Sequence, residues 1–260
     1  MKRHTHVSID YYAYVSGLKE WNVSYKALLA MAALLLVVAA DSIPLSVMTA
    51  LFMGSVSCIL GRVRAGDYFR LLLIPAAFIL TGGLAILIQF GTGAASLFCM
   101  PVLSTNLYVT KESLGQSLHV SLKAFGAVSC MYLLTLSTPM GEIIGVFRRL
   151  HVPNLVLELM HFIYRYIFVL LDINHRQKDA VRSRLGYQDG RMAFRVFGAE
   201  MANLLILSMS RAQEYYDALE SRGYDGSCLF WEEQRKLTAG PVLVGIFYAA
   251  LSAVLLLWFR

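Results

Sequence analysis

Five apolar stretches, separated by charged or turn-forming residues, limit what this chain can fold into. They cover residues 25–40, 45–61, 71–90, 114–138 and 241–259. A helix needs about 20 apolar residues to cross the hydrocarbon core of a bilayer, and these stretches approach or reach that length. Charged residues make up only 15% of the chain, below the level of roughly 25% that is ordinary for a soluble domain. The sequence therefore predicts an all-α, polytopic membrane protein with about five transmembrane helices.

The basic residues are distributed unevenly between the connections. Residues 139–237 hold 13 of the 23 lysines and arginines, whereas the connections at 41–44 and 91–110 hold none. Lysine and arginine accumulate in cytoplasmic connections. We therefore expect a cytoplasmic N-terminus, an irregular external loop at 91–110 and a cytoplasmic segment before the last span. The net charge of +6 follows from this asymmetry and does not call for a nucleic-acid partner.

This asymmetry divides the chain into three parts. Residues 1–138 hold the first four spans, residues 139–238 form a cytoplasmic helical segment, and residues 239–260 form the last span. In the cytoplasmic segment we predict a short amphipathic helix at 142–150 and a long helix at 155–185. A second long helix follows, because apolar positions recur in steps of three or four between Phe194 and Leu219.

Both long helices are predicted to end in an arginine followed by a glycine. The residues are Ser183, Arg184 and Gly186 at the first end, and Ser221, Arg222 and Gly223 at the second. Glycine can take the positive φ that ends a helix, and a cation is favourable near a helix C-terminus. The simpler interpretation of the arginines is this local effect; the repetition indicates two equivalent contacts. Because Leu185 separates Arg184 from Gly186, Arg182 remains an alternative at the first end.

Motifs of common catalytic chemistry are absent from the sequence. The chain contains no GxxxxGK[ST], HExxH or GxSxG, and its four cysteines form no CxxC pair. His4 and His6 are best explained as part of a solvated tail, and Arg165 is expected to pair with Glu158 or Asp172 or to extend toward water. We predict no catalytic residue, metal or cofactor. A polytopic membrane enzyme acting on lipid and a structural membrane adaptor are the alternative functions.

Four segments carry a resemblance to one family of transport proteins. They are residues 9–14 with Ser16 and Trp21, residues 136–139 with 147–153, residues 164–172, and residues 210–214 with 221–226. Together they resemble the transmembrane (T) component of energy-coupling factor (ECF) transporters, of the CbiQ type associated with cobalt. The similarity spans nearly the whole chain, and the last segment is its most specific part.

The resemblance implies a subunit without catalytic activity that works in an ATP-driven uptake system of the cytoplasmic membrane. In that family two long coupling helices cross in the cytoplasm, and the arginine ending each helix enters a groove on one of two ABC-type ATPase subunits. Carried over, Arg184 and Arg222 are the docking arginines, with Gly186 and Gly223 as helix stops. Closure of the ATPase subunits would shift the helices and reorient a separate substrate-binding membrane subunit. The implied cargo is cobalt or nickel, held by that other subunit.

Overall fold

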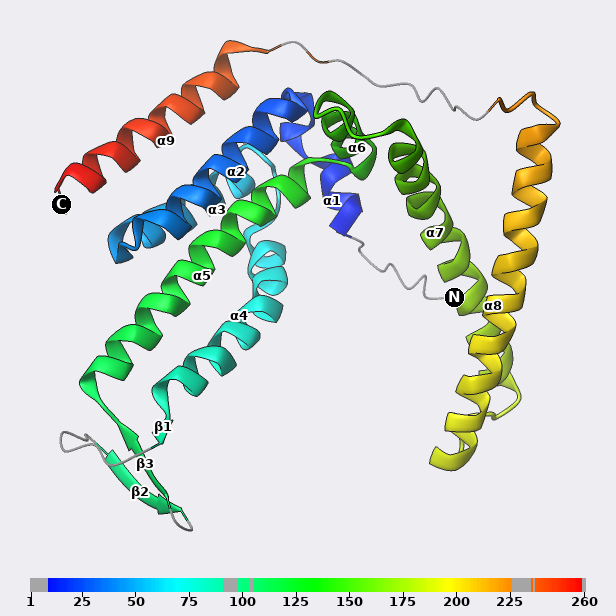
Figure 1. The fold of residues 1–260 in the computed structure, drawn as a ribbon, viewed down its shortest axis with the longest axis horizontal. Coiled ribbons are helices and arrows are strands. Elements are labelled where there is room, and N and C mark those ends of the chain that lie inside the picture. Colours follow the sequence, from blue (N-terminus) through cyan, green and yellow to red (C-terminus); the bar gives the residue numbers. More distant parts are fainter. Residues whose placement is uncertain (1–8, 91–97, 103–104, 226–234, 236, 259–260) are drawn as a thin grey trace. The chain divides into compact units, whose positions relative to one another are not determined.

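The computed structural model describes residues 9–90, 98–102, 105–225, 235 and 237–258. They form two compact units: the first unit comprises residues 1–143 and 233–260, and the second unit comprises residues 144–232. Helices make up nearly all of the regular structure in the described residues (Figure 1). The prediction of an all-helical membrane fold is therefore confirmed.

The first unit is built from seven complete helices and the start of an eighth. They are α1 (Ile9–Val15), the short 3₁₀ helix η1 (Gly17–Glu20), α2 (Val23–Ala40), α3 (Ile43–Ile59), α4 (Ala65–Leu87), α5 (Lys111–Ser137) and α9 (Ala239–Trp258), together with the first residues of α6 (Met140–Arg149). Side-chain caps define some of the boundaries. Asn22 Oδ1 accepts hydrogen bonds from the backbone N–H of Ser24 and Tyr25 and so starts α2. Asp41, in the left-handed conformation, ends it.

Helix α5 is the central element of the first unit and lies against α2, α3 and α4 (Figure 1). Small residues allow the close approach. A Cβ atom on Gly126 would meet the backbone oxygen of Ser46 at 3.0 Å, and Ser117 Oγ donates a hydrogen bond to the Gly83 carbonyl at 2.7 Å. Helices in a membrane associate through small residues and interhelical hydrogen bonds of this kind.

One charged cluster is buried in the first unit. Lys26, only 2% exposed, donates from Nζ to the carbonyl oxygens of Leu18 at 3.1 Å and Ser137 at 2.9 Å. The same Nζ lies 3.9 Å from Glu142 Oε2, while Glu142 Oε1 pairs with Arg235 at 3.2 Å. A buried cation is tolerated because carbonyl and carboxylate oxygens replace its water. The cluster joins the start of α2, the end of α5, α6 and the segment before α9.

Five helices in the described residues are long and apolar enough to cross a membrane, as predicted in number. They are α2, α4, α5, α8 and α9. The set differs from the predicted one in two places. Helix α3, predicted as the second span, is apolar but has 17 residues, and α8, predicted as a cytoplasmic helix, meets the criteria of length and composition. The chain is a multi-pass membrane protein.

The segment predicted as an irregular external loop contains short strands. Strand β2 (Phe98–Val102) pairs antiparallel with β3 (Thr105–Val109), and β1 (Gln89–Phe90) pairs with the other edge of β3. The expectation of a loop without strands is wrong for these residues. The segment is rich in aromatic and β-branched residues, which favour strands, and Pro101 disfavours a helix.

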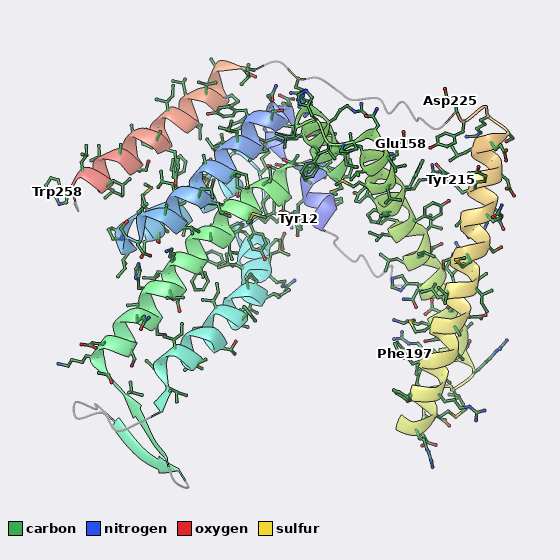
Figure 2. All side chains as sticks on the ribbon, in the orientation of Figure 1. Tyr12, Glu158, Phe197, Tyr215, Asp225 and Trp258 are labelled. Atoms are coloured by element: carbon green, nitrogen blue, oxygen red, sulfur yellow. The ribbon has the colours of Figure 1, made fainter. Side chains whose placement is uncertain are left out.

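The second unit consists of the end of α6 and two long helices, α7 (Asn154–Ser183) and α8 (Gly190–Glu220). The bounds of α7 agree with the predicted 155–185 to within two residues, the usual uncertainty of helix ends, and α8 begins four residues before the predicted seam of Phe194–Leu219. Side chains project from all sides of both helices (Figure 2). Many of the apolar ones are exposed; Phe194 and Phe197 lie in the predicted apolar seam of α8 and yet are 80% and 52% exposed. Much of the apolar surface of α7 and α8 is therefore not covered by the other described residues of this unit.

Candidate docking site

The ring of Tyr215 on α8 packs between two aromatic residues of α7. Its centroid lies 5.4 Å from those of both Phe162 and Tyr166, at interplanar angles of 73° and 88°. Edge-to-face pairs of this geometry are favourable beyond the area they bury. This cluster holds the two long helices against each other and confirms the C-terminal part of the predicted seam.

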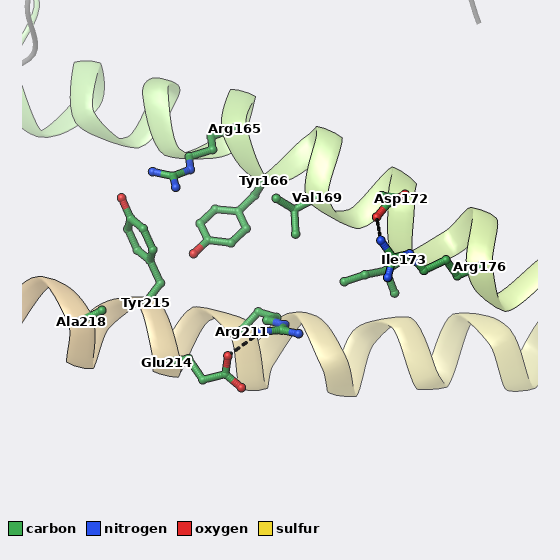
Figure 3. A pocket seen from close by; sticks show the side chains of 10 residues that line it. All are labelled: Arg165, Tyr166, Val169, Asp172, Ile173, Arg176, Arg211, Glu214, Tyr215 and Ala218. Carbon is green, nitrogen blue, oxygen red and sulfur yellow. Dashed lines mark hydrogen bonds and ion pairs between the residues drawn. The ribbon is translucent and has the colours of Figure 1, made fainter. Parts of the chain in front are cut away.

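A groove of ≈ 450 Å³ lies between α7 and α8 beside this cluster (Figure 3). Its acidic residues are paired with arginines of their own helices: Arg176 with Asp172 at 2.6 Å and Arg211 with Glu214 at 2.8 Å. The guanidinium of Arg165 lies over the ring of Tyr215, 5.5 Å from its centroid. Arg165 therefore makes a cation–π contact, whereas the sequence suggested an ion pair with Glu158 or Asp172 or an extension toward water.

Helix α8 ends in two hydrogen bonds that close its last turn. The backbone N–H of Tyr224 donates to Leu219 O at 3.2 Å, and that of Gly223 donates to Glu220 O at 2.9 Å. Gly223 has φ +79°. This is the Schellman pattern, in which a residue in the left-handed conformation follows the last helical residues. Gly223 is the helix stop, as predicted.

Helix α7 ends in the same pattern with a different residue in the left-handed position. The backbone N–H of Gly186 donates to Val181 O at 3.0 Å, and that of Leu185 donates to Arg182 O at 3.1 Å. Leu185 has φ +59°. The prediction that Gly186 is the helix stop is therefore wrong. Gly186 serves packing instead, because a Cβ there would lie 2.6 Å from Val181 Cγ1.

The two patterns fix the equivalence of the two ends. Arg184 and Arg222 each immediately precede the left-handed residue, and the serine before each arginine donates from Oγ to a carbonyl three residues earlier. Arg182 is equivalent to Glu220, so Arg184 is the counterpart of Arg222. The left-handed conformation costs a leucine roughly 1–2 kcal/mol, whereas glycine adopts it without this cost. The first end is thus the more strained of the two.

At each helix end, a tyrosine that follows the arginine forms a hydrogen bond to a glutamate of α7 or α8. Tyr187 donates from its hydroxyl to Glu200 Oε1 at 2.6 Å, and Tyr224 donates to Glu158 Oε2 at 3.0 Å. The hydrogen bond to Glu200 raises the pKa of Tyr187 above its ordinary value. Sequence reasoning did not predict these two hydrogen bonds; it named Glu158 only as a possible partner of Arg165. The only available signal was that a tyrosine follows the glycine at both ends.

The side chains of Arg184 and Arg222 are exposed. In the part of the chain that the structure describes, neither guanidinium has an ion-pair partner. Ser183 and Ser221 are exposed beside them, while Gly186 is buried and Gly223 is exposed. Each guanidinium offers five donors in a planar fork. The geometry therefore provides two similar cationic ends suited to carboxylate or carbonyl acceptors on another protein.

No group of three metal-ligating side chains is found among the described residues. His4 and His6 lie outside them.

Five helices long and apolar enough to cross a membrane, together with two long helices that end in exposed arginines, define a polytopic membrane protein. The match to the family model described as "Cobalt transport protein" covers residues 15–236, and the chain belongs to this CbiQ family. It is accordingly a CbiQ-family transmembrane component of a cobalt transport system, and membership implies a place in an ECF transporter complex.

Relatives agree with this assignment. The chain is 24% identical to the cobalt transport protein CbiQ of Rhodobacter capsulatus, over 95% of this chain and 96% of the relative. It is 30% identical to an uncharacterised protein of Methanocaldococcus jannaschii, over 85% and 82% of the two chains. A putative fused cobalt transport protein CbiMQ of Methanocorpusculum labreanum is 26% identical over 94% of this chain, which spans 41% of that longer protein.

Proposed function

We propose that this protein is the non-catalytic coupling subunit of an ECF-type uptake transporter. Arg184 and Arg222 each dock into a groove on one of two ABC-type ATPase subunits. The observation that carries the proposal is the equivalence of the two helix ends: the same hydrogen bonds, the same serine contact and the same exposed arginine recur at both. Local helix electrostatics alone would favour a cation at either end but would not require this repeated register.

In this proposal the aromatic cluster makes α7 and α8 move together. Tyr215 packs on two rings of α7, and Tyr224 after α8 bonds to Glu158 near the start of α7. Closure of the ATPase subunits would bring the two arginine ends together or apart. The helix pair then carries that displacement to a substrate-binding membrane subunit.

The cargo is proposed to be cobalt, or nickel, bound by the other membrane subunit. Support comes from the family description and from the name of the fused Methanocorpusculum labreanum relative, in which a CbiQ-like part shares one chain with a further part. The alternative function, a membrane enzyme acting on lipid, has no comparable support from the family match.

The experiment replaces each arginine and measures assembly with the ATPase subunits. A charge-assisted contact contributes about 1.5–3 kcal/mol, so removing one anchor is expected to weaken binding by one to two decades. Arg222→Glu should weaken binding more than Arg222→Ala, because it adds repulsion, and Arg184→Glu should behave like Arg222→Glu.

Arg182→Glu is the matched control. It lies on the same helix end and is also exposed, but its counterpart at the other end is Glu220, so binding is expected to stay near the wild-type level. Wild-type assembly and metal uptake in both Arg184→Glu and Arg222→Glu would exclude the docking role. Membrane insertion of every variant is checked in parallel.

A further inference from the structure

The two arginine ends differ in one respect that the shared pattern does not explain. At the second end the left-handed residue is Gly223, and at the first end it is Leu185. Glycine adopts this conformation freely, whereas a bulky residue with positive φ is a genuine outlier. A leucine at this position therefore calls for a compensating role.

Packing among the described residues of the second unit does not provide that role. The Leu185 side chain is 62% exposed. The neighbouring position, Gly186, is buried and has no room for a Cβ beside Val181. The side chain of Leu185 thus remains in solvent, next to the exposed guanidinium of Arg184. The hydrogen bonds that close the helix fix the left-handed conformation at position 185 but do not require a leucine there. An exposed apolar side chain at such a strained position is a reason to look for a functional contact.

We propose that Leu185 is an apolar anchor that enters the ATPase subunit together with Arg184. This inference rests on the proposed docking role of Arg184. The groove that receives the first end would then have an apolar wall beside the acceptor of the guanidinium, and the groove at the second end would need none beside Gly223. The two ends are therefore not interchangeable, and Leu185 determines which ATPase contact the first end makes.

The test measures docking and stability of the full chain with its ATPase subunits. In Leu185→Gly the strain is relieved, so Tm is expected to be unchanged or higher. Binding of the ATPase subunits is expected to fall by about tenfold to a hundredfold, since a leucine side chain would no longer be buried. Leu185→Met keeps an apolar side chain of similar volume and should bind within about threefold of wild type. Met192→Ala, which removes another apolar side chain that is 51% exposed, should leave binding unchanged.

The outcomes separate this inference from the docking role itself. If Leu185→Gly binds like wild type while Arg184→Glu does not bind, the apolar anchor is wrong and the docking role stands. If neither variant changes binding, both proposals are wrong. If Leu185→Gly lowers Tm and binding together, the leucine stabilises the fold and the anchor is rejected. Weaker binding with Tm retained supports the anchor.

Discussion

Tyr187 ties the connection between α7 and α8 to α8 itself. Its hydroxyl donates to Glu200, a carboxylate that is only 5% exposed. In Tyr187→Phe this buried acceptor loses a donor, and we expect the protein to become less stable. The corresponding change is a drop of several degrees in the Tm of the purified protein. Tyr216→Phe is the control, because that tyrosine is 54% exposed. Equal Tm values for Tyr187→Phe and Tyr216→Phe would contradict the structural role of this bond.

The same hydrogen bond predicts a dependence on pH. The carboxylate of Glu200 raises the pKa of Tyr187, so the stabilising contact is fully present below the ordinary tyrosine pKa. It is lost as the pH rises through the raised pKa, because a phenolate would then face the carboxylate. Absorbance titration of the tyrosines should show a late phase with the amplitude of one tyrosine in the difference between wild type and Tyr187→Phe. In Glu200→Gln that phase should move to lower pH; a phase that stays in place would disprove the assignment.

At the scale of elements, the position of α8 decides whether both arginine ends can reach the same side of the membrane. Helix α8 is long and apolar enough to cross a bilayer. If it did cross, Arg184 and Arg222 would lie on opposite faces, and the two could not both dock cytoplasmic ATPase subunits. The excess of basic residues at 139–237 favours a cytoplasmic position for the whole segment.

Single cysteines in a cysteine-free background test this topology. Cysteines at Asp189 and Glu220, at the two ends of α8, are expected to react with an impermeant reagent from the cytoplasmic side. A cysteine at Asn106 is expected to react from the outside. Labelling of Asp189 and Glu220 from opposite sides would show that α8 spans the membrane and would refute the proposed docking of both ends.

At the scale of the whole molecule, the buried charge cluster lies where the two units are connected. The chain leaves the first unit after residue 143 and returns to it at residue 233. Glu142 and Arg235, which lie next to these two connections, form an ion pair at 3.2 Å, and Glu142 also faces the buried Lys26. Both connections are thereby fixed to the membrane helices at one place. We call these contacts of Lys26, Glu142 and Arg235 the clamp. A displacement of the second unit would be transmitted through the clamp to α2 and α5.

Glu142→Gln is expected to loosen this clamp without touching the arginine ends. Removing one charge from a buried ionic cluster is costly, because the remaining charges lose their partner. We expect ATP hydrolysis by the assembled transporter to persist while metal uptake per ATP falls several-fold. Glu112→Gln, an exposed substitution in the first turn of α5, should leave that ratio at the wild-type value. An unchanged ratio of metal uptake to ATP hydrolysis in Glu142→Gln would show that the cluster has no coupling role.

The sequence alone determined the class of the protein and the position of its helices. Apolar length defines membrane spans, and a period of three to four residues defines long helices; both are local patterns that need no knowledge of the fold. Thus the presence and approximate extents of α7 and α8 and the arginine at the end of α8 could be predicted, whereas the choice between Arg184 and Arg182 at the end of α7 could not. The family could be predicted as well, since its motifs are short stretches of consecutive residues.

The tertiary structure decided features that depend on single residues or distant partners. One example is the choice between Leu185 and Gly186 for the left-handed position. The last hydrogen bonds of α7 and the contact of Gly186 with Val181 determine that Leu185 takes it. The periodicity of a helix cannot resolve that difference of one residue. Only folding brings together residues that are distant in the chain, such as Glu158 and Tyr224, which are 66 residues apart, or Lys26 and Glu142. Hydrogen bonds and ion pairs depend on distance in space and not on spacing in the chain.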